Sequence, residues 1–273
     1  MDTDRTSIRD YSSTATNGTA TNSPTFTASC KSGGCFNFDG TNDYINFGDI
    51  TTFDGAEELT ISAWAYDDLT SDAARYIVGK WYSGDKSFKL YTYGTDRDDL
   101  VFSITDGSTN CQKVTTDNSF SSGNWHHVVA IWRGGASAEI WIDGTEQTVA
   151  TLGSCGAVGT LANSDESLTI GAKYNEGGAP ESYWDGKIDQ VLIFDRAISD
   201  EQVGFLNATS TLIYNKTSDG EIELSQNWSV SVTPNDATVD GATRISVNKT
   251  IGTSNTNPNE PGWVGVDNDI NEN

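Results

Sequence analysis

Basic residues are scarce in this 273-residue chain, which has 16 Lys and Arg against 39 Asp and Glu and a formal net charge of -23 at pH 7. So negative a chain repels phosphate backbones and anionic lipid headgroups, which excludes nucleic acid and direct membrane insertion. Apolar runs of about 18 residues, the length that spans a bilayer, are also absent. The first residues lack a basic stretch followed by an apolar one, so we expect no signal peptide there. The chain is then either intracellular or a mature or excised part of a longer protein.

Cysteine and histidine are also few, with four Cys and two His. CxxC spacings and companion histidines are missing, so two separated cysteine pairs favour disulfides in an oxidising compartment over a zinc site. Of the three possible connectivities, we predict Cys30–Cys35 with Cys111–Cys155. The adjacent His126 and His127 are expected on opposite faces of one strand, one packed and the other facing solvent.

What the chain does contain is a β-protein composition, with 27 Gly, one Met and 10% aromatic residues. Period-two alternation recurs in short runs such as "LTISAWAYDD". The clearest hairpin joins "NWHHVVAIW" to "AEIWIDGTEQ" through Gly134-Gly135, and Asp143-Gly144 predicts the next turn. One helix start is visible, with Ser199 capping a single turn. The sequence therefore predicts an all-β protein.

Six segments extend this prediction to a family, because they resemble, in order and spacing, laminin-G-like jelly-roll domains of the concanavalin A-like lectin and glucanase superfamily. They are "FNFDGTNDYINFGD", "LTISAWAY", "NWHHVVAIW", "AEIWIDGTEQ", "LTIGAKY" and "WDGKIDQVLIFDRAISDEQV". The resemblance implies a two-sheet antiparallel jelly-roll sandwich over residues 9–210, after an N-terminal extension at 1–8.

The remainder of the chain is expected to form a small additional β segment at 211–251. Its "NWSVSVTPNDATVDG" resembles late strands of immunoglobulin-like repeats in archaeal and bacterial surface proteins. A complete sandwich needs about seven strands and about 100 residues, so this segment either packs on the jelly roll or is completed by a neighbouring chain. Residues 252–273 are interpreted as a polar linker or a strand-donating arm. Five sequons offer glycosylation sites: Asn17, Asn207, Asn215, Asn227 and Asn248.

The corner within "CFNFDGTNDYINFGD" is predicted to place Phe36 and Phe38 in the core while Asp39 to Asn42 turn the chain. The resemblance brings "GKIDQV" near this corner. A structural Ca2+ there would take oxygen ligands, and the candidates are Asp39, Asn42, Asp43 and Asp189. The alternative is that Asp and Asn serve only as turn formers.

Glycan binding is the predicted activity, because lectin-like jelly rolls hold sugars with aromatic rings and a few amides or carboxylates. The candidate rings are Trp81, Tyr82, Tyr91, Tyr93, Tyr183 and Trp184. The alternative for each ring is packing between the sheets or over an edge.

Catalysis is not expected. The glucanases of the superfamily place two glutamates around an aspartate on one strand face. Here Glu139 and Asp143 share a face, but Trp141 lies between them and Glu146 follows the turn, so the spacing fails. We therefore predict a non-catalytic extracellular surface or adhesion module that binds glycans or neighbouring surface proteins. A filament or coat subunit that self-assembles by strand complementation is the alternative, and a divergent glycoside hydrolase is third.

Overall fold

The computed structural model describes residues 8–10, 12, 16–27, 30–31, 34–68, 74–82, 84–93, 99–116 and 120–208, and the backbone alone of residues 7, 227–228, 231–232, 244–245 and 249–250. The chain divides into two compact units, Met1–Leu212 and Ile213–Asn273, which we describe separately. No helix in the described residues is long and apolar enough to cross a bilayer.

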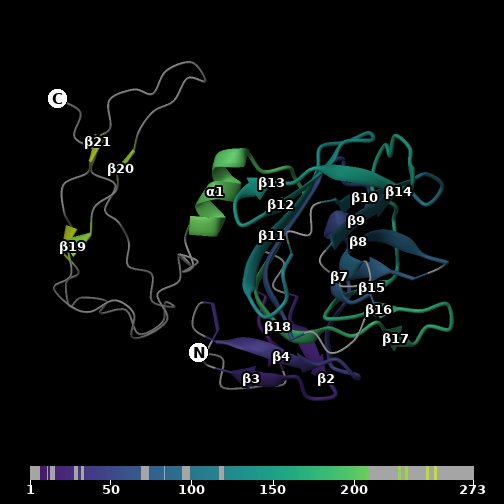
Figure 1. Cartoon of the computed structure of the whole chain (residues 1–273), viewed down its shortest axis with the longest axis horizontal. Coiled ribbons are helices and arrows are strands. Elements are labelled where there is room, and N and C mark those ends of the chain that lie inside the picture. The colour runs from purple at the N-terminus through teal and green to yellow at the C-terminus, as the bar shows by residue number, and fades with distance from the viewer. Residues whose placement is uncertain are drawn as a thin grey trace, which may run out of the picture. The chain divides into compact units, whose positions relative to one another are not determined.

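The first unit consists of two antiparallel sheets packed face to face (Figure 1). Sheet A has nine strands: β1 (Ser7–Ile8), β2 (Gly18–Thr21), β5 (Tyr44–Asp49), β15 (Ser167–Ile170), β7 (Tyr76–Trp81), β8 (Lys86–Tyr93), β9 (Asp99–Thr105), β10 (Asn110–Thr115) and β14 (Val149–Cys155), in this spatial order. Sheet B has seven: β13 (Thr145–Glu146), β12 (Ala138–Ile142), β11 (Trp125–Trp132), β6 (Leu59–Asp67), β18 (Asp185–Phe194), β4 (Cys35–Asp39) and β3 (Thr25–Thr27). The predicted all-β jelly-roll sandwich is confirmed.

The core lies between the two sheets, because alternate side chains of each strand point inward. From β8 of sheet A, Phe88 and Leu90 enter it, and from β11 of sheet B, Val128 and Trp132 do. All four are fully buried. Burying each of these side chains contributes on the order of 2 kcal/mol, which fixes the register of both central strands.

The aromatic corner connects the two sheets, since β4 lies in sheet B and β5 in sheet A. Phe38 is fully buried and Phe36 packs against the same core, as predicted. The turn depends on Gly40, whose φ of 71° is in the left-handed region. A Cβ on Gly40 would also lie 2.6 Å from an Arg75 guanidinium nitrogen. The corner therefore passes the chain from one sheet to the other and does not form a hairpin.

The predicted hairpin is present, because β11 pairs with β12 through Gly134-Gly135. Asp143 and Gly144, with φ of 51° and 77°, form the predicted turn between β12 and β13. On β11, His126 faces the inner side and His127 the outer side, as expected from alternation. The expectation that one of them faces solvent is wrong, since they are 8% and 2% exposed.

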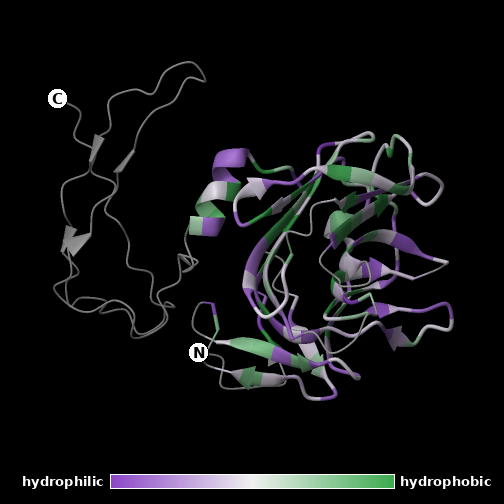
Figure 2. Ribbon diagram, in the orientation of Figure 1, coloured by the Kyte–Doolittle hydropathy of each residue, from purple (hydrophilic) through white to green (hydrophobic). Residues whose placement is uncertain are grey.

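The outer face of sheet B is covered by helix α1 (Asp200–Ala208). Val129 and Ile131 of β11 pack there against Ile198 and Val203. Figure 2 shows that α1 carries both hydrophilic and hydrophobic residues. The Ser199 hydroxyl accepts a hydrogen bond from the Gln202 amide at 3.4 Å, while the Gln202 side chain accepts one from the Ser199 amide at 3.1 Å. This capping box begins a helix of nine residues rather than the predicted single turn.

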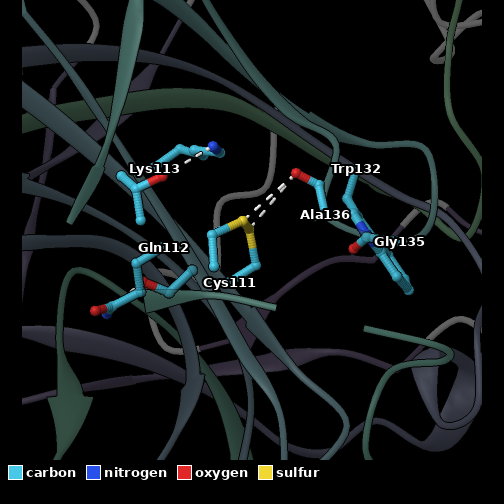
Figure 3. Close-up of a disulfide and its surroundings, with 9 residues drawn as sticks. Cys111, Gln112, Lys113, Trp132, Gly135 and Ala136 are labelled. Carbon is cyan, nitrogen blue, oxygen red and sulfur yellow. Dashed lines mark hydrogen bonds between the residues drawn. A yellow bond between two sulfur atoms is a disulfide. The ribbon is translucent and has the colours of Figure 1, made fainter. Parts of the chain in front are cut away.

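Both predicted disulfides are present, Cys30–Cys35 and Cys111–Cys155. The second one joins β10 to the edge strand β14 of sheet A. Its sulfur atoms lie 3.9 and 3.4 Å from the carbonyl oxygen of Ala136, in the turn between β11 and β12 of sheet B (Figure 3). The bridge therefore fixes one edge of sheet A beside a turn of sheet B.

The second unit contains two short antiparallel pairs among its described residues. β19 (Asn227–Trp228) pairs with β22 (Lys249–Thr250), and β20 (Ser231–Val232) pairs with β21 (Arg244–Ile245). The immunoglobulin-like character of 211–251 stays a prediction. The predicted arm at 252–273 lies outside the described residues.

Candidate functional site

A groove of about 830 Å³ opens on the outer face of sheet A, opposite the face that packs on sheet B. Its floor comes from β8 and β10, and one rim comes from the pair β16 (Lys173–Tyr174) and β17 (Pro180–Glu181). Polar side chains predominate in its lining, which consists of Trp81, Lys86, Lys89, Asn110, Gln112, Ser154, Lys173, Tyr174, Asn175, Glu176, Gly177 and Glu181.

Lys89 lies on the groove floor because its strand neighbours Phe88 and Leu90 take the inward positions. Its Nζ atom is 4.3 Å from the centroid of the Trp81 ring and 4.8 Å from that of Tyr91. Tyr91 stacks in turn on Tyr76, with centroids 4.7 Å apart and planes 9° apart. The rings thus form an aromatic cage that holds an ammonium group by cation–π attraction.

Burial lowers the pKa of Lys89 to about 8, and the positive charges of Lys173 and Lys86 lower it further in the same direction. Burial also raises the pKa of Tyr91 to about 12, so its hydroxyl is neutral at pH 7. Near neutral pH the Lys89 side chain in the cage is therefore protonated. Because its pKa is only about one unit higher, a modest rise in pH removes the charge.

Amides and a β-hairpin complete the groove. The Gln112 side-chain amide donates to the Ser103 hydroxyl at 2.8 Å, which orients it on the floor. On the rim, Lys173 forms an ion pair with Glu181. The Asn175 side-chain oxygen accepts from the amides of Gly177 and Ala179 at 2.8 and 3.1 Å, which closes the turn between β16 and β17. The groove thus offers oriented hydrogen-bonding groups on two sides.

Of the six predicted sugar-binding rings, Trp81 lines the groove directly. Tyr91 lies in the aromatic cage. Tyr82 supports the rim, because its hydroxyl donates to the carbonyl of Glu176 at 2.7 Å. Tyr93, at the end of β8, is 43% exposed.

The remaining two rings have other partners. The Tyr183 hydroxyl donates to the Pro180 carbonyl at 2.6 Å. Trp184 is fully buried in the core, where its indole N–H donates to the Tyr66 carbonyl at 3.2 Å. The prediction that Trp184 binds sugar is therefore corrected, because its ring packs between the sheets.

Sequence reasoning did not identify the lysines and amides of the groove. Lys89 shares a strand face with Tyr91 by simple alternation in "KSFKLYTYG", and this was the available signal. Asn110, Gln112 and Lys173 come from other strands, and their convergence depends on the order of sheet A.

The four predicted calcium ligands do not converge on one position. The Asp39 carboxylate accepts the amides of Thr41 and Asn42 at 2.9 and 3.4 Å, which is the geometry of a turn former. Asp43 is buried and accepts the Asp39 amide at 3.3 Å. Burial, and then the Asp39 charge, raise the pKa of Asp43.

The strand of Asp189 does lie beside the corner, but its register places Asp185 opposite Asp39 and Asp189 opposite Trp64. Asp185 forms an ion pair with Arg75 at 3.1 Å. Among the described residues no three His, Cys, Asp or Glu side chains cluster as a metal site would require. These residues do not fit a calcium ion as a set, and a thermal unfolding measurement with and without chelator tests the prediction directly.

The carboxylates considered for catalysis have structural partners. Glu139 forms a two-point ion pair with Arg133, at 2.9 and 3.3 Å. Asp143 accepts from the His126 ring at 2.6 Å and from the His127 amide at 2.9 Å. Burial raises the pKa of Asp143, but these hydrogen bonds outweigh it and hold the pKa below its usual value. Both carboxylates therefore stabilise sheet B.

The sequon asparagines are divided between the two units. Asn17 is exposed, although its side-chain oxygen accepts the Asp10 amide at 3.0 Å. Asn207 is half-buried in α1. The side chains of Asn215, Asn227 and Asn248 lie outside the described residues.

Residues 39–204, which contain the entire groove, match the family model described as concanavalin A-like lectin/glucanases superfamily. The chain belongs to this superfamily. The match covers most of the first unit, in agreement with the two sheets described above. No curated protein matches the chain.

Solved structures similar to this superfamily member include three binding domains. That of Paraclostridial Mosquitocidal Protein 1 has 16% identity and a TM-score of 0.56, over 73% of this chain and 48% of that one. The botulinum neurotoxin serotype G binding domain has 13% identity and a TM-score of 0.53, over 73% and 48%. The botulinum neurotoxin DC binding domain in complex with SialylT has 11% identity and a TM-score of 0.54, over 75% of this chain and 49% of that one. The chain thus spans about half the length of these structures, and at such identity the likeness shows the fold alone.

Proposed function

We propose that the chain is a non-catalytic, extracellular carbohydrate-binding module whose ligand occupies the groove on sheet A. The observation that carries this proposal is the groove itself. Its volume of about 830 Å³ is within the range of small-ligand sites. It brings ammonium and amide donors together with carboxylate acceptors, which is the set of groups that hydrogen-bond to sugar hydroxyls.

Membership of a lectin and glucanase superfamily supports this assignment, as does the likeness to toxin binding domains, one of which was solved with SialylT. Two disulfides support an extracellular location, since such bonds persist in oxidising compartments.

The carboxylates of the described lining support a binding role over hydrolysis. They belong to Glu176 and Glu181, and Glu181 is ion-paired with Lys173. A glycosidase needs an acid and a second carboxylate at a set separation, both free to act on the sugar, whereas the Glu181 carboxylate is engaged by the Lys173 ammonium. Incubation with oligosaccharides is therefore expected to release no reducing sugar, and a release that Glu139→Gln abolishes would establish the hydrolase instead.

Glycan-panel binding by the full chain tests the proposal. Trp81→Ala removes a groove wall and one ring of the cage, so we expect affinity for any bound glycan to fall at least about tenfold. Trp125→Ala is the matched control, because Trp125 packs against Tyr66, with centroids 5.7 Å apart, on β11 of sheet B. Circular dichroism checks that both variants fold.

Gln112→Ala provides a second groove variant that leaves the aromatic packing intact. It is expected to weaken binding by about threefold to tenfold through the loss of one hydrogen-bonding group. Binding that survives both groove variants, or that Trp125→Ala weakens equally, would place the sugar elsewhere.

A further inference from the structure

Two buried lysines on sheet A have opposite environments. Lys80 of β7 is fully buried, and its Nζ atom donates to the Asp49 carboxylate at 2.7 Å and to the carbonyls of Ser164 and Glu166 at 2.6 and 2.8 Å. Its charge and all its donors are matched, which is the arrangement expected of a lysine that stabilises the fold.

Lys89 lacks such partners, although it is only 8% exposed. Within the described part of the chain, its Nζ atom has one hydrogen-bond acceptor, the Tyr76 hydroxyl at 3.5 Å, and otherwise contacts aromatic rings. No carboxylate among the described residues pairs with it. Burying a cation without a counter-ion destabilises a fold, so stability does not explain its position.

A second unmatched group lies on the same strand face. Ser87 is fully buried two residues before Lys89, and its hydroxyl has no hydrogen-bond partner in the described residues. Lys86 is a third groove side chain without a counter-ion among the described residues. Its Nζ atom lies 5.7 Å from the centroid of the Trp81 ring, and no described carboxylate pairs with it. Among the described residues, Lys173 is the one groove lysine with a carboxylate partner, Glu181.

We infer that the groove binds an acidic sugar, with the ammonium of Lys89 contacting the carboxylate or sulfate group of the ligand. The inference rests on the proposed function and names its ligand class. Within the described lining the ammonium groups of Lys86, Lys89 and Lys173 outnumber the carboxylates of Glu176 and Glu181, which gives the groove a local positive charge in a chain whose net charge is -23. The anionic group of the ligand would supply the counter-ion that Lys89 lacks. In the ligand-free state, the aromatic cage would hold the ammonium at the groove floor.

The experiment is a panel of immobilised neutral, carboxylated and sulfated oligosaccharides, followed by calorimetric titration of the best acidic ligand. Its neutral counterpart, the methyl ester of a carboxylated sugar or the desulfated form of a sulfated one, is titrated in parallel. We expect the acidic form to bind at least about tenfold more tightly than the neutral form. The carboxylated and sulfated arms show which anion the groove prefers.

Lys89→Met keeps the side-chain length and removes the charge, so it should abolish the preference for the acidic form and bring its affinity down to that of the neutral form. Lys113→Met is the matched control. Lys113 lies on β10 of the same sheet, outside the groove lining, where its Nζ atom donates to the Thr151 hydroxyl at 3.1 Å.

A pH series adds an independent readout. The titratable and charged groups around Lys89 are Tyr76 of β7, Tyr91 and Lys86 of β8, and, elsewhere in the groove lining, Glu176 and the Lys173–Glu181 pair of β16 and β17. Because Lys89 has a pKa of about 8, affinity for the acidic sugar should fall about tenfold between pH 7 and pH 9.5. Lys89→Met should remove this dependence.

The outcomes separate the two proposals. Equal binding of acidic and neutral forms overturns the acidic-sugar inference and leaves carbohydrate binding standing. The inference also fails when Lys113→Met reduces acidic-sugar affinity as much as Lys89→Met does. Absence of binding to every glycan on the panel overturns the proposed function itself.

Discussion

The two outer faces of the sandwich are built by the same strand alternation but have different contents. On sheet B, Val129 and Ile131 point outward and are covered by the chain's own helix α1. On sheet A, Lys89 and Gln112 point outward into the groove. The first face is used for folding, while the second keeps a buried cation that no described carboxylate neutralises. Helix α1 therefore covers the outer face of sheet B and leaves the groove on sheet A uncovered by it.

A substitution in sheet B beneath helix α1 should cause the largest loss of stability, and it tests whether the covered face serves folding. Ile131→Ala leaves a cavity between sheet B and α1, because Ile131 is fully buried in that cluster. We expect the free energy of unfolding to fall by about 4 kcal/mol. Denaturant unfolding measures the loss, and groove binding should be unchanged in the folded variant. A loss below about 1 kcal/mol would mean that α1 contributes little to the covered face.

Protonation of His127, on the outer face of sheet B, should cause the next largest loss of stability. Burial lowers the pKa of His127 from 6.5 to about 4, against the attraction of Asp143, and the charge of Lys31 lowers it too. Below pH 6.5 the unfolded chain binds a proton that the folded chain does not, so stability is lost as pH falls. Between pH 6.5 and pH 4 we expect a loss of about 3 kcal/mol.

Equilibrium unfolding across this pH range, compared with His127→Gln, isolates the contribution. Glutamine retains a partner for the Ser62 hydroxyl, which lies 2.9 Å from the His127 ring, but does not titrate. An unchanged pH profile in His127→Gln would assign the acid sensitivity to another group.

The two buried lysines give the smallest effects and the closest comparison. Lys80→Met leaves the Asp49 carboxylate and two carbonyls without their donor, so the free energy of unfolding should fall by about 2 kcal/mol. The loss is limited to this size because the Asp49 side chain is 35% exposed and water can reach it. Lys89→Met removes an unmatched buried cation and should raise the free energy of unfolding by up to about 1 kcal/mol. Thermal and denaturant unfolding of both variants measure the difference. A destabilised Lys89→Met would show that Lys89 serves the fold after all.

Sequence patterns predicted the sandwich well where the signals were local. Alternation predicted the β11–β12 pairing, and the conformational freedom of Gly144 predicted the following turn. The extent of α1 was not predictable from its first turn, because its length depends on packing against Ile131 and its neighbours on sheet B.

The candidate site was less predictable because it depends on register and sheet order. Trp184 follows a loop with two adjacent glycines that looked exposed, yet its indole nitrogen meets the Tyr66 carbonyl in the core. Asp189 lies four residues beyond the residue opposite Asp39, a shift that strand propensity does not encode. The charge on Lys89 was visible in the sequence, but the lack of a carboxylate partner for it among the described residues depends on how distant strands meet.

The cross-link between Cys111 and Cys155 bears on how the groove matures. Gln112 and Ser154 are the sequence neighbours of Cys111 and Cys155 and lie in the groove lining. Within the described residues, β14 is held at the edge of sheet A by pairing with β10 alone. Oxidation of one thiol pair therefore sets the span between two side chains of the groove lining. On the proposed function, a chain with these thiols reduced would keep the interior of the sandwich but lose the fixed position of β14, so ligand affinity would depend on oxidation.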